Sequence, residues 1–286
     1  MTVRPLELRT AGLVFEADVA GVPGSPLVLL LHGFPQTSHT WRHQLPALAD
    51  AGFFAVAPNQ RGYSPHARPP RVEDYSTDLL IADARTMVKS LGYQHYHLVG
   101  HDWGGQLSWL IAAQCPTELD SLTVLSRPHP AAFAAAMKAD TTQADRSRHH
   151  RAFQDANAAR ELLADDAHRL RLTLRNQGVA DADIAAYLTR LGTFEALDAA
   201  ISWYRAPRVA GGALARPDVP PVTVPTMYLW GDQDATVGRI AAEATANQVT
   251  GLYRFEALPG VGHFITDQAP ERVNELLLEW LATAAR

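Results

Sequence analysis

The chain has 286 residues, with 25 basic and 30 acidic side chains, a formal charge of −5 and 47% hydrophobic residues. This length and composition exclude a disordered chain and predict one large globular domain with room for an insertion. The mild acidity, without a basic block, argues against nucleic acid or an anionic membrane as the main partner.

The single cysteine, Cys115, cannot form an internal disulfide, and no set of cysteines and histidines is typical of zinc. We therefore expect a cytoplasmic protein with no metal and no other cofactor. The first residues lack the pattern of a signal peptide, and the longest apolar run, Leu27–Leu31, is far too short to span a bilayer. We expect a soluble protein, and its oligomeric state stays open.

Strand and helix signals alternate in the first part of the chain. Short apolar or alternating runs predict strands at residues 6–10, 13–19, 27–31, 53–57, 95–100 and 121–126. Helical patterns lie at residues 41–51 and 76–91, and a third helix begins after Asp102. This alternation predicts a parallel sheet, covered by helices on both faces, after an antiparallel start.

The middle of the chain, from about residue 128 to residue 212, loses its strand character. Helical propensity is found there at residues 131–137, 155–176 and 182–191. Afterwards the alternation resumes, with a strand at 226–230, a helix at 237–248, a strand at 252–258 and a closing helix at 270–284. We expect a core made of residues 1–127 and 213–286, with a helical cap at residues 128–212.

The hexapeptide GHDWGG, at residues 100–105, directly follows one predicted strand and directly precedes a predicted helix. Its glycine spacing is that of a nucleophile elbow, a tight turn that lifts its central side chain above the edge of the sheet. Asp102 occupies the nucleophile position. For this motif alone, a glycine-rich turn capped by an aspartate is the alternative.

The tetrapeptide HGFP, at residues 32–35, follows the strand at 27–31. Such a loop can turn the backbone N–H of Phe34 toward the elbow, and the N–H of Trp103 supplies a second donor. Together they predict an oxyanion hole, although a plain turn punctuated by glycine and proline is the alternative for this motif in isolation.

Two further motifs follow later strands. Residues 231–234, GDQD, offer two acids, Asp232 and Asp234. Residues 259–264, PGVGHF, place His263 on a glycine-rich loop after the last predicted strand. We expect His263 to be catalytic, because nucleophile, acid and histidine then follow one another in the order of the α/β-hydrolase triad.

With these motifs the chain resembles the α/β-hydrolases of the epoxide hydrolase and haloalkane dehalogenase branch, whose elbow carries Asp in place of Ser. The similarity covers essentially the whole chain, and residues 32–64 and ISWYRA at 201–206 are especially similar to microbial epoxide hydrolases. The resemblance implies an α/β-hydrolase fold with a mostly parallel eight-stranded sheet and a cap after the sixth strand. It also favours Asp234 as the acid, because relatives place theirs fourth in a G-x-x-D turn, and it leaves Asp232 as a solvated or turn-capping acid.

The same resemblance implies donors in the cap. Tyr204 matches the family's cap tyrosine, and a phenol with a pKa of about 10 stays protonated at neutral pH. Many relatives have a second cap tyrosine, but here His149 stands in its place, with His150 and Tyr187 as weaker candidates. An imidazole titrates near neutrality, so we expect ring opening to depend more on pH than in a two-tyrosine enzyme.

An aspartate nucleophile favours a substrate with an electrophilic sp³ carbon, because attack there gives a stable alkyl ester rather than a labile anhydride. The resemblance implies an epoxide hydrolase in which Asp102 forms that ester, His263 activates water, and Asp234 orients His263. The expected partners are a small-molecule epoxide and water.

We expect Phe34, Trp103 and Trp203 to contact the substrate. The main alternative is a haloalkane dehalogenase, since the indole N–H of Trp103 can bind a departing halide. Phe34 opposes it, because many dehalogenases have an asparagine there, and so does Tyr204. A secondary dehalogenase activity stays open, and a catalytically silent ligand receptor is a remote alternative. A fluoroacetate dehalogenase is disfavoured because Trp103, not arginine, follows the nucleophile, and an esterase because no serine occupies the elbow.

Overall fold

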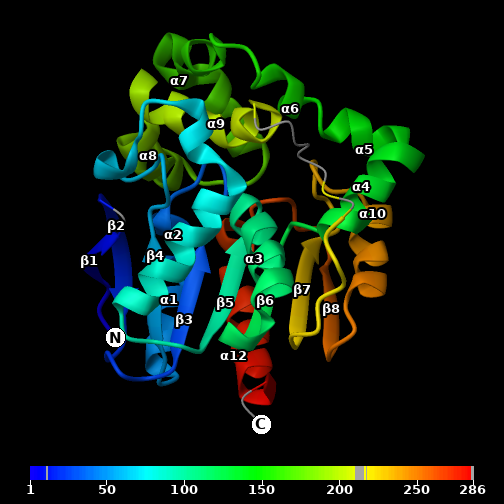
Figure 1. Ribbon diagram of the computed structural model, residues 1–286. Coiled ribbons are helices and arrows are strands. Elements are labelled where there is room, and N and C mark those ends of the chain that lie inside the picture. The colour runs from blue at the N-terminus through cyan, green and yellow to red at the C-terminus, as the bar shows by residue number, and fades with distance from the viewer. Residues whose placement is uncertain (11, 210–215, 217, 285–286) are drawn as a thin grey trace.

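The computed structural model describes residues 1–10, 12–209, 216 and 218–284, which fold around one eight-stranded sheet (Figure 1). The strand order is β1-β2-β4-β3-β5-β6-β7-β8. β1 pairs with β2 and β2 with β4 in antiparallel fashion, whereas the other pairs are parallel. This confirms the predicted fold class. The strands are β1 (Arg4–Thr10), β2 (Leu13–Ala20), β3 (Leu27–Leu31), β4 (Phe54–Pro58), β5 (Tyr96–His101), β6 (Leu119–Leu125), β7 (Thr226–Gly231) and β8 (Tyr253–Leu258).

Alternate residues of the central strands face opposite sides of the sheet. Leu29 and Leu31 of β3 belong to a core on the side of α2 and α3, whereas Val28 and Leu30 belong to a second core with α1 and α12. Figure 1 shows α2 and α3 in front of the sheet and α12 behind it. Because both faces are covered, β3 reads as a continuous apolar run. The core helices are α1 (Gln44–Asp50), α2 (Thr77–Ser90), α3 (Trp103–Gln114), α10 (Arg239–Ala244), α11 (Ile265–Gln268) and α12 (Pro270–Ala284).

Between β6 and β7 the chain leaves the sheet and forms a helical cap, which lies over the carboxyl ends of the parallel strands (Figure 1). The predicted boundary between residues 212 and 213 lies outside the described residues. None of the helices in the described part of the chain is long and apolar enough to cross a membrane. The cap helices are α4 (Pro130–Ala139), α5 (Thr141–Arg146), α6 (His149–Ala152), α7 (Ala158–Asn176), α8 (Asp181–Leu191) and α9 (Phe194–Val209).

Four cap helices differ from the sequence prediction. The helices α5 and α6 were not predicted at all. α7 contains a kink, in which Asp165, Asp166 and Ala167 have positive φ angles, so the helix consists of two pieces. α9 was not predicted as a helix, because aromatic residues lower its helix propensity and Pro207 lies inside it.

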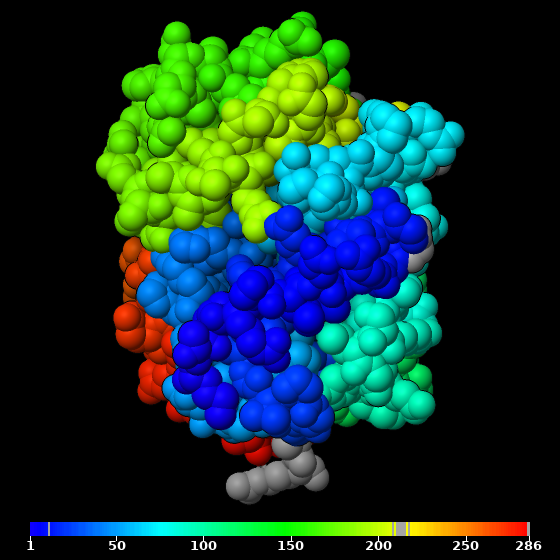
Figure 2. Space-filling view, turned by 90° about the vertical axis from the view of Figure 1, so that its left-hand side faces the viewer, coloured from blue at the N-terminus to red at the C-terminus, as the bar shows by residue number. Residues whose placement is uncertain are grey.

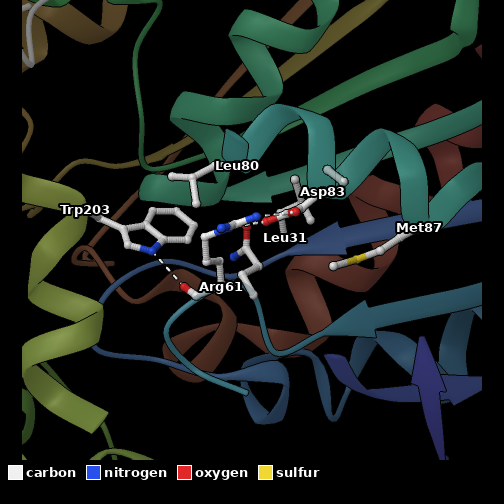
Figure 3. Close-up of a pocket in the computed structure, with 8 residues that line it drawn as sticks. Leu31, Arg61, Leu80, Asp83, Met87 and Trp203 are labelled. Carbon is white, nitrogen blue, oxygen red and sulfur yellow. Dashed lines mark hydrogen bonds and ion pairs between the residues drawn. The ribbon is translucent and has the colours of Figure 1, made fainter. Parts of the chain in front are cut away.

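The cap packs on the loop that follows β4. In Figure 2 the segment around residues 60–75 meets the yellow-green part of the cap. Trp203 of α9 donates from Nε1 to the Arg61 carbonyl at 2.8 Å, and Arg61 donates from Nε to the buried Asp83 carboxylate at 2.6 Å (Figure 3). The space beside these residues, about 10 Å³, is far too small for a substrate. This contact is therefore a structural joint between cap and core.

Candidate active site

Asp102 lies in the tight turn between β5 and α3, at the carboxyl end of the sheet. Its φ of 49° and ψ of −114° lie in a region that non-glycine residues rarely adopt. At Gly104 an added Cβ would lie 2.0 Å from the carbonyl oxygen of Leu31, and at Gly33 an added Cβ would lie 2.4 Å from the Cβ of Asp102. Glycine at both positions lets the turn approach the loop after β3 and raises the Asp102 side chain against it.

That loop supplies a backbone donor to the carboxylate. The N–H of Phe34 donates to Asp102 Oδ1 at 3.0 Å. Trp103 is the first residue of α3, so its N–H is among those that no helical carbonyl accepts. These are the two groups that the sequence assigned to an oxyanion hole, and that role stays a prediction.

His263 lies between two carboxylates. Its Nδ1 is 2.9 Å from Asp234 Oδ2, and its Nε2 is 3.6 Å from Asp102 Oδ2. All three side chains are largely buried. The structure therefore brings together the three residues that the sequence selected as nucleophile, base and acid. Asp232, the rival acid, accepts the N–H of Gly260 at 2.8 Å instead.

The charges of the three groups depend on one another. Burial by itself lowers the pKa of His263, but the negative charges of Asp234 and Asp102 raise it to about 10. Burial by itself raises the pKa of Asp102, yet the hydrogen bond and charge of His263 hold it well below its ordinary value. The pKa of Asp234 is lowered in the same way, against its burial, by His263 and by Thr236. At neutral pH the resting site holds two carboxylates and one imidazolium.

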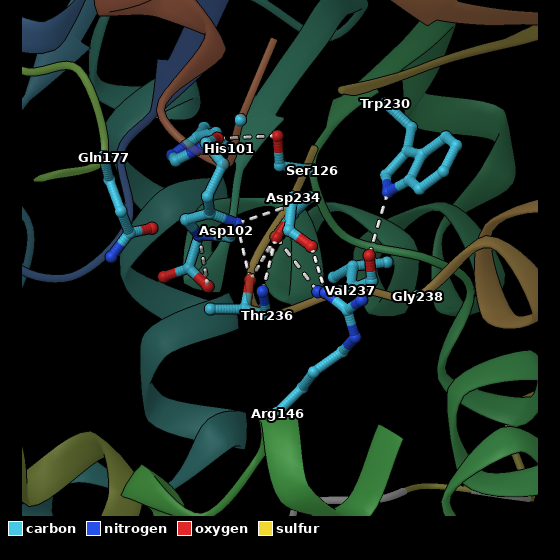
Figure 4. Close-up of polar contacts among 12 residues, drawn as sticks. His101, Asp102, Ser126, Arg146, Gln177, Trp230, Asp234, Thr236, Val237 and Gly238 are labelled. Atoms are coloured by element: carbon cyan, nitrogen blue, oxygen red, sulfur yellow. Dashed lines mark hydrogen bonds and ion pairs between the residues drawn. The ribbon is translucent and has the colours of Figure 1, made fainter. Parts of the chain in front are cut away.

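Two residues that sequence reasoning missed hold the backbone of His263. Its carbonyl oxygen accepts from His101 Nε2 at 2.9 Å and from Ser126 Oγ at 2.8 Å (Figure 4). Burial lowers the pKa of His101 to about 4, so its ring is neutral at pH 7. His101 could have been predicted, because it directly precedes the nucleophile in the motif GHDWGG. Ser126 belongs to no motif that points to such a role.

Thr236 is a further residue that the sequence did not reveal. Its Oγ1 lies 2.7 Å from Asp234 Oδ1 and 2.7 Å from His263 Nδ1. The backbone N–H groups of Thr236 and Val237 donate to the same Asp234 oxygen at 2.7 and 3.0 Å (Figure 4). Thr236 lies two residues beyond the acid and outside the GDQD motif at residues 231–234.

A cavity of about 570 Å³ lies between the core and the cap. Asp102 and His263 line it from the core, and Tyr204 of α9 and His149 of α6 line it from the cap. The rings of Tyr204 and His149 are 6.0 Å apart, and that of Tyr204 is 5.6 Å from Phe34, which also lines the cavity. Much of the remaining wall is apolar, with Phe153, Leu162, Leu170 and Leu174.

The two cap donors differ in their charge states. Burial and the charge of Asp102 raise the pKa of Tyr204 well above its ordinary value, so the phenol keeps its proton at neutral pH. Burial lowers the pKa of His149, so its imidazole is neutral there.

Other predicted contacts lie elsewhere. Trp203 does not line the cavity, because its indole N–H donates to the Arg61 carbonyl. Successive residues of a helix point about 100° apart, so Tyr204, the next residue, faces the cavity instead. The Tyr187 hydroxyl donates to Asp267 at 3.0 Å and is likewise absent from the cavity wall, so Tyr187 does not fit a second donor. Trp203 and Tyr187 therefore both lie off the cavity wall that the structure describes.

Two more predicted residues adjoin the cavity without lining it. The Trp103 ring packs edge-on against Tyr204, with centroids 5.1 Å apart, but is not among the lining residues that the structure describes. His150 packs against His149 at 4.4 Å and against Tyr204 at 5.6 Å, and it too lies outside the described wall.

The arrangement supports a two-step displacement. An ionised carboxylate that faces a cavity with a protonated phenol can attack an electrophilic carbon, while the phenol protonates the departing oxygen. The buried histidine and its carboxylate partner can then activate water against the resulting ester. Within the described ranges, no three His, Cys, Asp or Glu side chains gather as ligands for a metal ion.

Known proteins share this architecture. The model of the α/β hydrolase fold family matches residues 26–270. Epoxide hydrolase 4 of Mus musculus is 32% identical over 98% of this chain and 80% of its own, and epoxide hydrolase A of Mycobacterium tuberculosis is 30% identical over 95% of each chain. The crystal structure of a Bacillus megaterium epoxide hydrolase in complex with an inhibitor has a TM-score of 0.86 and 26% identity, over 97% of this chain and 100% of that chain.

Proposed function

The chain belongs to the α/β hydrolase fold family, in its epoxide hydrolase branch, and from this premise we propose that it converts epoxides to vicinal diols through an ester on Asp102. The observation that carries the proposal is the ionised Asp102, in the place of a serine, in one cavity with His263 and the protonated Tyr204. A small epoxide and water are the substrates.

In the first half-reaction, Asp102 attacks one epoxide carbon. The new bond joins its carboxylate oxygen to that carbon, the carbon–oxygen bond of the ring breaks, and the electron pair goes to the epoxide oxygen. Tyr204 donates its proton to this oxygen, because an alkoxide is a poor leaving group. We assign His149 as the second donor, on the same cavity wall.

The ester removes the negative charge of Asp102. The pKa of His263 then falls, since one of the two carboxylates that raise it is gone. His263 can release its proton to the tyrosinate through water, so Tyr204 is restored and the base becomes neutral when it is needed.

In the second half-reaction, neutral His263 takes a proton from a water molecule, which attacks the carboxyl carbon of Asp102. We assign the N–H groups of Phe34 and Trp103 to the oxyanion that forms. Its collapse breaks the bond to the alkyl oxygen, and His263 returns a proton to that oxygen. The diol leaves, and the new carboxylic acid of Asp102 passes its proton to His263, which restores the carboxylate and the imidazolium of the resting site. The sum is epoxide plus water to diol. Asp234 stabilises the imidazolium whenever His263 carries the second proton.

Two assays run side by side test this function against the dehalogenase alternative. We expect diol formation from styrene oxide, and halide release from 1-bromobutane that is absent or much slower. The reverse order would assign the chain to dehalogenation, and no turnover of either class would favour a silent receptor. We also propose a cytoplasmic location, on the single cysteine of the chain.

A further inference from the structure

The hydroxyl of Thr236 bridges the acid and the base. It donates to Asp234 Oδ1 and accepts from His263 Nδ1, each at 2.7 Å. The same Nδ1–H also faces Asp234 Oδ2 at 2.9 Å. Two acceptors that share one N–H define the orientation of the imidazole ring more narrowly than a single oxygen does.

The ester intermediate changes which contacts hold His263. In the resting site, Nε2 is attracted to the Asp102 carboxylate at 3.6 Å. An alkyl ester is neutral, so this attraction disappears once Asp102 has reacted. The contacts of Nδ1, with Asp234 and Thr236, must then keep Nε2 directed toward the water. The bridge is therefore needed in the second half-reaction more than in the first.

The cap holds Thr236 by its backbone. Gln143 of α5 donates from Nε2 to the Thr236 carbonyl at 2.8 Å, and its Oε1 accepts the N–H of Gly238 at 2.8 Å. Arg146, from the same helix, donates to the carbonyl of Asp234, and Figure 4 shows it reaching from the cap toward this loop. These contacts fix the backbone of Thr236, whereas its hydroxyl bonds to Asp234 and His263.

We propose that Thr236 is a positioning residue for the base, which keeps the His263 ring aimed at the ester during its hydrolysis. This inference rests on the proposed function, because it assigns Thr236 to one half of that reaction. It predicts that loss of the hydroxyl slows ester hydrolysis and leaves ester formation unchanged.

The test measures both half-reactions with styrene oxide under single-turnover conditions, with the ester on Asp102 quantified by mass spectrometry after acid quench. Thr236→Val removes the hydroxyl at nearly constant volume, and Thr236→Ser retains it. Thr189→Val is the matched control, because that hydroxyl bonds only to the Ala185 carbonyl within its own helix.

In Thr236→Val we expect hydrolysis to slow about tenfold or more, so that the ester accumulates, with ester formation within about twofold of wild type. Thr236→Ser should recover to within about threefold of the wild-type hydrolysis rate, and Thr189→Val should match wild type.

Hydrolysis at the wild-type rate in Thr236→Val would overturn the proposal, and so would an equal loss in both half-reactions or no recovery in Thr236→Ser. If the valine variant does not fold, Thr236→Ala takes its place with the same expectations. Wild-type protein that forms neither ester nor diol would instead reject the proposed function. In that case NMR still tests the positioning role. The Nδ1 proton of His263 should exchange with solvent faster in Thr236→Val than in Thr236→Ser.

Discussion

At the scale of single residues, the charge of Asp102 links the two half-reactions. It raises the pKa of His263, and it is lost when the ester forms. The pKa of about 10 depends on two carboxylates, Asp234 and Asp102, acting against burial. In Asp102→Asn one of them is replaced by a neutral amide of the same shape. We expect the pKa of His263 to fall by about one unit or more. An NMR titration of the His263 ring would measure it, and an unchanged pKa would refute the charge change that the second half-reaction uses.

The same groups determine how stability varies with pH. The pKa of His263 is about 10 in the folded chain and about 6.5 in the unfolded chain. Its contribution to the free energy of unfolding is therefore complete below about pH 6.5 and is lost as the pH rises through about 10. The pKa values of Asp102 and Asp234 are lowered, so their contribution is present above their ordinary values and is lost in acid. Between pH 6.5 and 10 the wild type should therefore lose more stability than Asp102→Asn, as thermal unfolding would show.

Tyr204 should act in ring opening alone. Tyr204→Phe keeps the ring that packs against Phe34 but removes the donor to the epoxide oxygen. We expect alkylation of Asp102 to slow about a hundredfold, with hydrolysis of the ester little changed. Tyr187→Phe is the matched control, because that cap hydroxyl is bonded to Asp267 and lies off the cavity wall. Equal effects of the two substitutions on alkylation would contradict the assignment.

His149 gives ring opening a pH dependence on the acid side. Its pKa is lowered by burial, so the ring gains a proton only below the ordinary value of about 6.5. The protonated ring can donate to the epoxide oxygen. Alkylation rates of wild type and His149→Phe should therefore diverge as the pH falls below about 6.5, with the wild type faster. Superimposable profiles from pH 5 to 9 would rule out His149 as a donor.

Among the structural elements, the short helix α11 links the base to the cap. It begins two residues after His263, and two of its side chains reach the cap. Asp267 accepts from Tyr187 of α8 at 3.0 Å and from Arg42 and Gln36 of the core at 2.7 and 2.8 Å. Gln268 donates to the carbonyl of Gln177, and its Oε1 accepts the N–H of Gly262 at 2.5 Å. The loop that carries the base is thus joined to α8 and to Gln177, the residue that follows α7.

Loss of one bond in this joint should weaken the fold without stopping ring opening. Tyr187→Phe leaves Asp267 with its two core partners, so the buried carboxylate stays partly satisfied. We expect the free energy of unfolding to fall by about 1.5–3 kcal/mol, the range for a hydrogen bond to a charged group. Urea unfolding would measure it. An unchanged midpoint would show that the Tyr187–Asp267 bond does not secure the cap.

The elements differ in how well the sequence predicted them. β3 was predictable because both of its faces are buried, and the turns at Asp102 and His263 because glycine spacing marks them. α9 was missed, and with it the distinction between Tyr204, which faces the cavity, and Trp203, which faces Arg61. Which of two neighbouring residues faces the cavity depends on the rotation of the helix about its own axis, and this rotation is set by tertiary packing. Thr236 escaped because its role depends on two side chains from different loops.

In the molecule as a whole, the site is assembled from segments far apart in the chain. The turn after β5, the loops after β3, β7 and β8, and two cap helices each contribute, and the sheet order places the first four at one edge. The cap closes the cavity over this edge and also holds the loop of Asp234 through α5. Catalytic geometry and cap docking therefore depend on the same contacts.

The covalent ester on Asp102 is the central claim, and trapping it is the most direct test. His263→Gln removes the base while the nucleophile stays in place, so the ester should form with styrene oxide and persist. Mass spectrometry of the intact protein should show a gain of one substrate molecule, and peptide mapping should locate it on Asp102. No mass gain, or an adduct on another residue while the wild type forms diol, would contradict the account.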